Sequence, residues 1–223
     1  MIKAIFIDID GTLLDFEACL EESMRLGLIE RGIEYKDEML DTFHRINNGL
    51  WRDLEQGKLT FEELLKIRWA TVFAELGIDL DGPEFEAYFR KRLHESAIPM
   101  AGSYGMLDYL SGKYRLFAAS NGPHEQQVER LRKADMLKYF EEVFTSGKIG
   151  AEKPSKEFFE YCFKKYPELL PEESVMIGDS LTSDIKGGKG FGMKTVWLNL
   201  GEKDKNEDVD FEVKTLDEIK NIL

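Results

Sequence analysis

Short hydrophobic runs that end in polar or glycine residues recur along the chain and predict β-strands. The predicted strands cover residues 2–10, 114–122, 142–147, 174–180 and 194–199. Apolar residues at helical spacing occupy two of the intervals between the later strands, at 125–138 and 155–166. Alternation of strands and helices at this spacing is typical of a parallel sheet joined by right-handed crossovers. The pattern therefore predicts an α/β fold with a doubly wound parallel sheet, whose active site lies beyond the carboxyl ends of the strands.

The region after the first predicted strand breaks this alternation. It is charged and lacks convincing strands, and its apolar spacing predicts four helices, separated by glycines, near residues 16–31, 36–56, 60–76 and 83–95. We interpret residues 16–96 as a helical cap domain inserted into an α/β core domain made of residues 1–15 and 97–223. A separate, solvent-exposed helical bundle is the alternative interpretation.

Composition and charge narrow the classes of function. The chain has 223 residues, of which 43% are hydrophobic, so it can build a real hydrophobic core and disorder is disfavoured. The formal net charge of −13 repels nucleic acid polymers and anionic membranes, so neither is expected as a partner. A small anion can still bind, provided that it meets a locally positive pocket.

The cysteines and the N-terminal stretch indicate a compartment. Cys19 and Cys162 lie in helical patterns without metal-ligand spacing, which predicts core residues in a reducing compartment rather than a disulfide framework or a zinc site. Asp8 and Asp10 interrupt the apolar start before a signal-peptide core could form, and no apolar stretch reaches the roughly 18 residues of a membrane span. We expect a cytoplasmic protein.

The stretch IFIDIDGTLLD, residues 5–15, places two carboxylates among apolar residues. A buried charge costs several kcal/mol unless something pairs with it. Residues two apart on an extended strand share a face, so Asp8 and Asp10 should project similarly at the end of the first strand. Such a pair favours a hard divalent cation, which prefers oxygen ligands. An aspartate-rich turn is the alternative.

Polar residues also follow three later strands. In AASNG, Ser120 and Asn121 offer a hydroxyl and backbone N–H groups to a phosphate oxygen, and in GAEKPS the ammonium of Lys153 can neutralise an anion. In IGDSLTSD, Asp179 and Asp184 add carboxylates for a metal. Turn residues, a surface charge and a helix cap are the respective alternatives. Their occurrence at successive strand ends favours a single site.

With these motifs the chain resembles the haloacid dehalogenase superfamily of phosphohydrolases over essentially its whole length. DIDGTLLD matches the first motif, Ser120 the second, Lys153 the third and GDSLTSD the fourth. The resemblance implies a doubly wound core with a helical cap inserted after the first strand. It also implies a magnesium cofactor (Mg2+) and a covalent aspartyl-phosphate intermediate.

The same resemblance implies a role for each motif residue. Asp8 matches the nucleophile, and Asp10 matches the general acid and base, which would bind the metal only through its carbonyl. Asp179 matches a magnesium ligand, with Asp184 supporting the metal site through water. Dehalogenases of this fold lack the second aspartate, so cleavage of a carbon–halogen bond is disfavoured.

Residues 45–65, RINNGLWRDLEQGKLTFEELL, resemble the cap of bacterial pyrimidine 5′-nucleotidases that clear noncanonical nucleotides. Asn47 and Asn48 could hydrogen-bond a base edge, and Trp51 could stack on a base or sugar. The alternative is that Trp51 packs with Leu50 and Leu54 as one helix stripe. We expect the partner to be a small phosphorylated metabolite, and the enzyme to be a phosphatase of pyrimidine nucleoside 5′-monophosphates. A phosphoglycolate or sugar-phosphate phosphatase, a phosphomutase and a non-catalytic phosphate-binding scaffold remain as alternatives.

Overall fold

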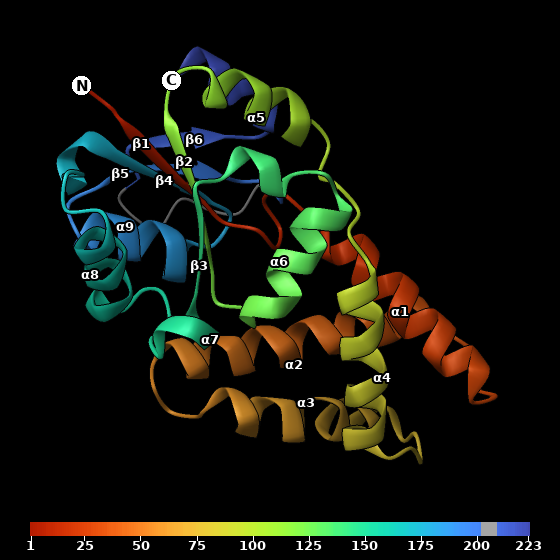
Figure 1. Ribbon diagram of the computed structural model, residues 1–223. Coiled ribbons are helices and arrows are strands. Elements are labelled where there is room, and N and C mark those ends of the chain that lie inside the picture. Colours follow the sequence, from red (N-terminus) through yellow and green to blue (C-terminus); the bar gives the residue numbers. More distant parts are fainter. Residues whose placement is uncertain (202–208) are drawn as a thin grey trace. The chain divides into compact units, whose positions relative to one another are not determined.

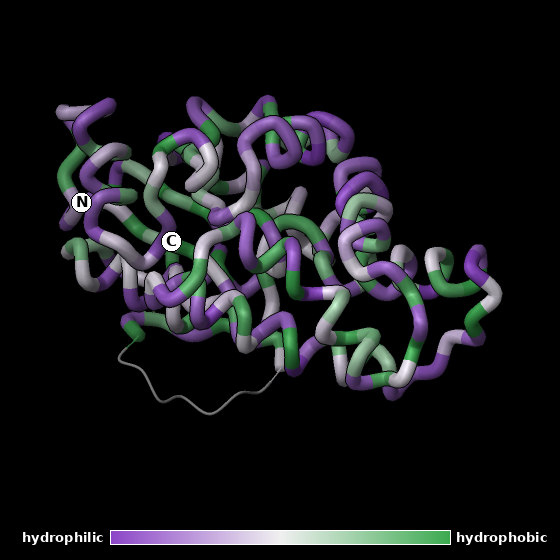
Figure 2. The backbone as a smooth tube through the Cα atoms, turned by 90° about the horizontal axis from the view of Figure 1, so that it is seen from below, coloured by the Kyte–Doolittle hydropathy of each residue, from purple (hydrophilic) through white to green (hydrophobic). Residues whose placement is uncertain are grey.

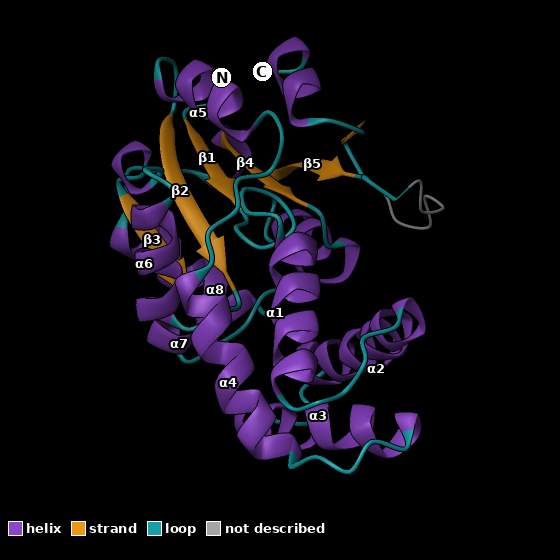
Figure 3. Cartoon of the chain, turned by 90° about the vertical axis from the view of Figure 1, so that its right-hand side faces the viewer, coloured by secondary structure: helices purple, strands orange, loops and turns teal. Residues whose placement is uncertain are grey.

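The computed structural model describes residues 1–201 and 209–223, which divide into two compact units. Unit 1 consists of Met1–Phe16 and Ala97–Leu223, and unit 2 consists of Glu17–Ser96. Every strand that the structure describes belongs to unit 1, whereas unit 2 contains helices and loops (Figures 1 and 3). The function of unit 2 as a cap stays a prediction.

Unit 1 is built on a parallel sheet, which confirms the predicted fold class. Its strand order over the described residues is β3-β2-β1-β4-β5-β6. From the central strand β1, the sheet extends to β2 and β3 on one side and to β4, β5 and β6 on the other. The direction of winding therefore reverses beside β1, and in α/β sheets a ligand crevice is expected at such a switch point. The strand bounds are β1 Ala4–Ile7, β2 Arg115–Ser120, β3 Glu142–Thr145, β4 Ser174–Gly178, β5 Lys194–Leu198 and β6 Phe211–Val213.

The first five strands correspond to the five predicted ones, but each is shorter. The expectation that Asp8 and Asp10 share a face of the first strand is wrong, because β1 ends at Ile7. Only Asp8 prolongs the pairing with β4, through its N–H to the carbonyl of Ile177 at 2.9 Å. The sixth strand, β6, was not predicted, since its three residues are too few to show a clear alternation.

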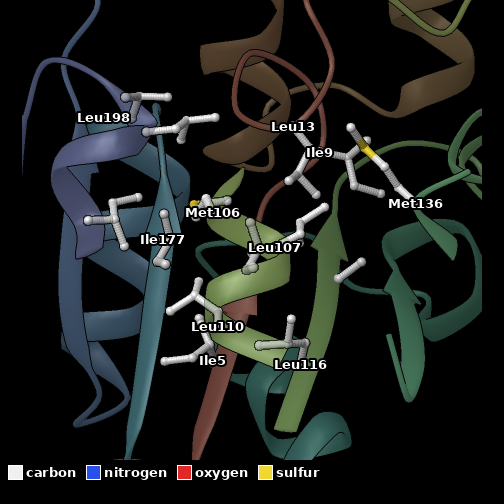
Figure 4. Packing of buried hydrophobic residues seen from close by; sticks show 14 of the residues in the cluster. Ile5, Ile9, Leu13, Met106, Leu107, Leu110, Leu116, Met136, Ile177 and Leu198 are labelled. Carbon is white, nitrogen blue, oxygen red and sulfur yellow. The ribbon is translucent and has the colours of Figure 1, made fainter. Parts of the chain in front are cut away.

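Helices cover both faces of the sheet, because side chains alternate between faces along each strand. Ile5 and Ile7 join the cluster with α5, whereas Ala4 and Phe6 join the cluster with α8. Figure 4 shows α5 laid across the strands, with Leu107 and Leu110 among the strand side chains. The helices of unit 1 are α5 Ser103–Ser111, α6 His124–Lys133, α7 Ser146–Ile149, α8 Lys156–Lys165 and α9 Lys186–Gly190, with short helical segments η1 Leu137–Tyr139, η2 Pro171–Glu173, η3 Leu181–Ile185 and η4 Leu216–Asn221.

Unit 2 contains the helices predicted for the insert. They are α1 Phe16–Glu30, which begins at the last residue of unit 1, α2 Asp37–Glu55, α3 Phe61–Leu76 and α4 Gly82–Glu95. A capping box between Thr60 and Glu63 fixes the start of α3, since each side chain bonds the backbone N–H of the other residue. One of the glycines between the predicted helices, Gly82, is instead the first residue of α4. Buried aromatic side chains from α2, α3 and α4 pack together in this unit, namely Phe43, Trp69, Phe73, Phe85 and Phe89.

A buried ion pair lies within this aromatic interior. The Arg68 guanidinium on α3 donates to both carboxylate oxygens of Glu86 on α4, at 3.0 and 2.6 Å, and each side chain is 5% exposed. The same guanidinium donates to Oδ1 of Asn47 on α2 at 3.1 Å and lies over the ring of Phe89. The Arg68 guanidinium therefore joins three helices through three hydrogen bonds.

Replacement of Glu86 by alanine is expected to lower the free energy of unfolding by about 3–5 kcal/mol, because Arg68 would stay buried without its carboxylate. Urea unfolding followed by circular dichroism measures the change. Glu75→Ala is the matched control, since Glu75 pairs with Arg45 through side chains that are 49% and 60% exposed. The control should match wild type. Equal stability of both variants would contradict a structural role for the buried pair.

Hydrophobic and hydrophilic residues alternate along the described chain (Figure 2). None of the described helices combines the length and the apolar character that crossing a membrane requires. Cys19 and Cys162 are both buried, as their helical patterns predicted. The predicted cytoplasmic location stays a prediction.

Candidate active site

The predicted motif residues of unit 1 gather at the carboxyl ends of three neighbouring strands. Asp8 follows β1, Ser120 is the last residue of β2, and Asp179 follows β4. Because these strands are adjacent and parallel, their ends lie at one edge of the sheet. Lys153 reaches the same place from the loop between α7 and α8.

Lys153 is the central cation of this site. Its ammonium donates to Oδ1 of Asp8 at 2.7 Å, to Oδ1 of Asp184 at 2.6 Å and to the carbonyl of Ala119 at 2.6 Å, so all three N–H donors are used. The side chain is 1% exposed. Burial lowers the pKa of Lys153, but the carboxylates of Asp184 and Asp8 outweigh burial and leave the pKa raised. Lys153 is therefore a fixed positive charge, and the alternative of a surface lysine is excluded.

The carboxyl group of Asp8 is in an unfavourable setting for a negative charge. Burial raises its pKa well above the ordinary value, the Lys153 ammonium partly offsets this, and the nearby carboxylates of Asp184 and Asp179 raise it further. One ammonium does not balance three carboxylates. A further positive charge would favour the ionised form of Asp8.

Asp8, Asp179 and Asp184 each offer a carboxylate oxygen, and these atoms lie within 4.8 Å of one another. Three hard oxygen donors with excess negative charge suit Mg²⁺. Two glycines allow the carboxylates to approach the backbone. A Cβ on Gly11, whose φ is +85°, would lie 2.8 Å from Oδ2 of Asp179, and a Cβ on Gly178 would lie 2.2 Å from Oδ2 of Asp184.

Asp184 is held more directly than the sequence predicted. Besides Lys153, it accepts a hydrogen bond at Oδ2 from the backbone N–H of Ser180 at 3.1 Å, and it is buried within the segment η3. Its carboxylate therefore fixes the position of Lys153 as well as adding charge to the cluster. Support of a metal through water stays a prediction.

Asp10 has different partners from Asp8. Its carboxylate is outside the three-carboxylate cluster, and it accepts hydrogen bonds from Gln127 Nε2 and Arg130 Nη1, both on α6. The Asp10 side chain is 31% exposed, whereas those of Gln127 and Arg130 are fully buried. The side chain of Asp10 is thus held by α6 rather than by the carboxylate cluster, and its role in proton transfer and its carbonyl contact with a metal stay predictions.

Ser120 and Asn121 have separate roles. The Ser120 Oγ atom accepts from the backbone N–H of Gly122 at 3.0 Å and from Gln127 Nε2 at 2.7 Å. The Asn121 side chain bonds the backbone of Lys153 twice, with Nδ2 donating to the carbonyl at 2.9 Å and Oδ1 accepting from the N–H at 2.7 Å. Its amide therefore positions Lys153, and contact of Asn121 with substrate stays a prediction.

The three residues of unit 2 that were predicted to bind a base differ in burial. Asn47 is buried and bonded to Arg68, which makes it an interior residue rather than a group that meets a base. Asn48 is exposed. Trp51 is half-buried with its ring 5.9 Å from that of Phe61, as expected from the packing alternative, although the partner is not on the predicted stripe.

Sequence reasoning missed Gln127 and Arg130. A signal was present, because Gln127, Arg130, Leu131 and Ala134 follow the i, i+3, i+4, i+7 spacing of a buried helix face. Two long polar side chains at core positions need partners inside the protein. The sequence of α6 alone does not indicate which residues these partners are.

Comparison with known proteins places this chain in a family. The family model described as haloacid dehalogenase-like hydrolase matches residues 2–192. The crystal structure of YfnB from Bacillus subtilis, which is bound to magnesium, superposes with a TM-score of 0.93 at 33% identity, covering 99% of this chain and 98% of that one. The agreement with YfnB thus extends over the whole described fold.

Two nucleotidases are similar in sequence. The pyrimidine 5′-nucleotidase PynA of Streptococcus pneumoniae (strain ATCC BAA-255 / R6) is 33% identical over 88% of this chain and 84% of its own length. The pyrimidine 5′-nucleotidase YjjG of Escherichia coli (strain K12) is 26% identical over 98% of this chain and 96% of its own length.

Proposed function

Because this chain belongs to the haloacid dehalogenase-like hydrolases, we propose that it is a magnesium-dependent phosphatase that forms an aspartyl-phosphate on Asp8 and prefers pyrimidine nucleoside 5′-monophosphates. The phosphatase class follows from the family and its curated members.

The observation that carries the proposal is the different setting of Asp8 and Asp10. Asp8 lies in a buried cluster with an ammonium and two further carboxylates, whereas Asp10 is partly exposed and bound to α6. Two carboxylates held apart in this way can take two roles, nucleophile and proton carrier. A phosphate-binding scaffold has no need of a proton carrier, so the presence of Asp10 argues against a scaffold. The same residue favours ester hydrolysis over cleavage of a carbon–halogen bond.

In the first step a carboxylate oxygen of Asp8 attacks the phosphorus atom of the ester. The bond between phosphorus and the ester oxygen breaks, and its electron pair stays on that oxygen, which takes a proton from Asp10. The products are the alcohol, an aspartyl-phosphate on Asp8 and an ionised Asp10. Lys153 and Ser120 contribute a positive charge and a hydroxyl donor for the phosphate oxygens.

In the second step water attacks the phosphorus of the aspartyl-phosphate. Asp10 takes a proton from this water, the bond between phosphorus and Asp8 breaks, and its electron pair returns to the Asp8 carboxylate. Phosphate is released and both carboxyl groups regain their starting states. A magnesium ion held by Asp8 and Asp179, with Asp184 beside it, would supply positive charge to the phosphate oxygens.

The substrate preference is proposed from the stretch 45–65 and from the nucleotidases PynA and YjjG. Asn48 and Trp51 are the side chains of this stretch that we propose for base recognition, since one is exposed and the other is half-buried. Asn47 is left out because it is buried with Arg68. The motif residues of unit 1 handle only the phosphate and should treat all monoesters alike.

A substrate panel tests this preference. With magnesium present, kcat/KM for dUMP is expected to exceed the values for AMP, phosphoglycolate and glucose 6-phosphate by several-fold or more, because one fitted hydrogen bond contributes roughly 0.5–1.5 kcal/mol. Asn48→Ala should reduce the advantage of dUMP over glucose 6-phosphate without changing kcat/KM for the latter.

The rival functions give different results in the same panel. A tenfold higher kcat/KM for phosphoglycolate or glucose 6-phosphate than for dUMP would refute the nucleotidase preference and leave a phosphatase for other metabolites. Absence of phosphate release from all four esters, and from p-nitrophenyl phosphate, would refute catalysis and favour the scaffold. Glu75→Ala, which changes an exposed residue of unit 2, is the control for Asn48→Ala.

A further inference from the structure

The side chain of Gln127 connects two separate parts of the candidate active site. Its Nε2 group donates to Oδ2 of Asp10 and, at 2.7 Å, to Oγ of Ser120. Its Oε1 atom accepts from Arg130 Nη1 at 3.1 Å. Both N–H donors and the carbonyl oxygen are therefore used, and only this orientation of the amide satisfies all three partners.

The contacts of Ser120 fix the direction of its hydroxyl hydrogen. The Oγ atom already accepts from the Gly122 N–H and from Gln127 Nε2, which occupies both of its lone pairs. The hydroxyl can then act only as a donor toward a third group. In a phosphatase that group is a phosphate oxygen, so Gln127 keeps the Ser120 hydroxyl in the donor state needed for binding.

The contacts of Asp10 fix the plane of its carboxyl group. Gln127 binds Oδ2 and Arg130 binds Oδ1, and both donors come from α6. Each carboxylate oxygen keeps another lone pair for a proton or a leaving group. Gln127 and Arg130 are fully buried, whereas Asp10 is 31% exposed, so these two side chains act through Asp10 and do not themselves meet the substrate.

We propose that Gln127 is a positioning residue that orients the acid/base carboxyl group of Asp10 and the phosphate-binding hydroxyl of Ser120 at the same time. The inference rests on the proposed function, since it assigns a means of orientation to two of its groups. A hydrophobic residue of similar size would fill the same space and leave both groups without their donor. Protonation of the leaving oxygen and binding of phosphate should then weaken together.

Leaving-group dependence separates this role from a purely structural one. Gln127→Leu should lower kcat/KM for dUMP, whose alkoxide needs a proton to leave, by at least about tenfold, because a small misplacement of an acid can cost up to about 100-fold. For p-nitrophenyl phosphate, whose phenolate leaves without a proton, the loss should be smaller and no greater than the several-fold that weaker binding of the phosphate group causes. The inhibition constant of inorganic phosphate should rise several-fold, because the Ser120 hydroxyl loses its fixed direction.

Gln126→Leu is the matched control, since it makes the same substitution one residue earlier on α6 and should change none of the three constants. Equal losses on both esters, or equality of Gln127→Leu with the control, in an enzyme whose wild type is active, would overturn this inference alone. A wild type that hydrolyses neither ester would overturn the proposed function and the inference with it. If thermal melting shows that Gln127→Leu is unfolded, Gln127→Glu replaces it, because glutamate has the same shape, keeps the acceptor for Arg130 and lacks both donors.

Discussion

Replacement of Asp8 by asparagine is expected to lower kcat for phosphate ester hydrolysis by roughly 10⁴-fold or more, because the loss of a catalytic nucleophile has effects of this order. Asparagine keeps the shape of the side chain and an oxygen acceptor for the Lys153 ammonium, which donates to Asp8 Oδ1 at 2.7 Å. An amide is too weak a nucleophile to displace the alcohol. The phosphoenzyme, sought in acid-quenched wild-type reactions by mass spectrometry, should be undetectable in the variant.

Folding and binding should survive this substitution. The melting temperature of the Asp8→Asn variant should stay within a few degrees of that of the wild type. Titration calorimetry in magnesium buffer should still detect the binding of inorganic phosphate to the variant. Asp217→Asn is the matched control, because Asp217 pairs only locally with Lys220, at 2.9 Å, through a side chain that is 67% exposed. The control should turn over substrate normally. Near-normal turnover by protein verified to carry Asp8→Asn would remove Asp8 from the role of nucleophile.

Chelation of divalent cations is expected to reduce phosphatase activity by about 10³-fold or more, and added magnesium should restore it. The reason is charge: three clustered carboxylates and a phosphate dianion meet one ammonium in the site, and a metal contributes several kcal/mol to such a transition state. Activity before chelation, after chelation and after the addition of magnesium gives the result directly. Full activity in protein shown by elemental analysis to be metal-free would contradict the magnesium requirement.

Asp179→Asn separates loss of metal from loss of catalysis. Calorimetric titration with magnesium chloride, in the absence of substrate, should give a dissociation constant at least about tenfold above that of wild type, because one anionic ligand is lost. Asp217→Asn should bind magnesium as the wild type does. Equal magnesium affinity in all three proteins would show that Asp179 is not a ligand, even if activity depends on the metal.

The sequence anticipated the sheet and the placement of its motifs well. Alternating hydrophobic runs are a local property, so five of the strands could be located from short windows, and the motifs at their ends marked one edge of the sheet. The predicted ends of the strands were less accurate. The apolar run continues through Ile9, but β1 ends at Ile7 and only the N–H of Asp8 still bonds a neighbouring strand. The longer predicted strand put Asp8 and Asp10 on one face, whereas the structure gives them separate partners.

The sequence by itself determined the α/β class, the helical insert and the identity of Asp8, Asp10, Ser120, Lys153 and Asp179 as candidate site residues, because each depends on residue type and short-range spacing. Only the tertiary structure decided which groups these residues bind. Lys153 bonds Asp8 across 145 positions of the chain and Asp184 across 31, and Gln127 bonds Asp10 across 117. The burial of Asn47 against Arg68 is likewise a product of three helices packing together. Such pairings follow from which elements pack against each other, and local hydrophobic periodicity carries no information about a hydrogen bond to a distant element.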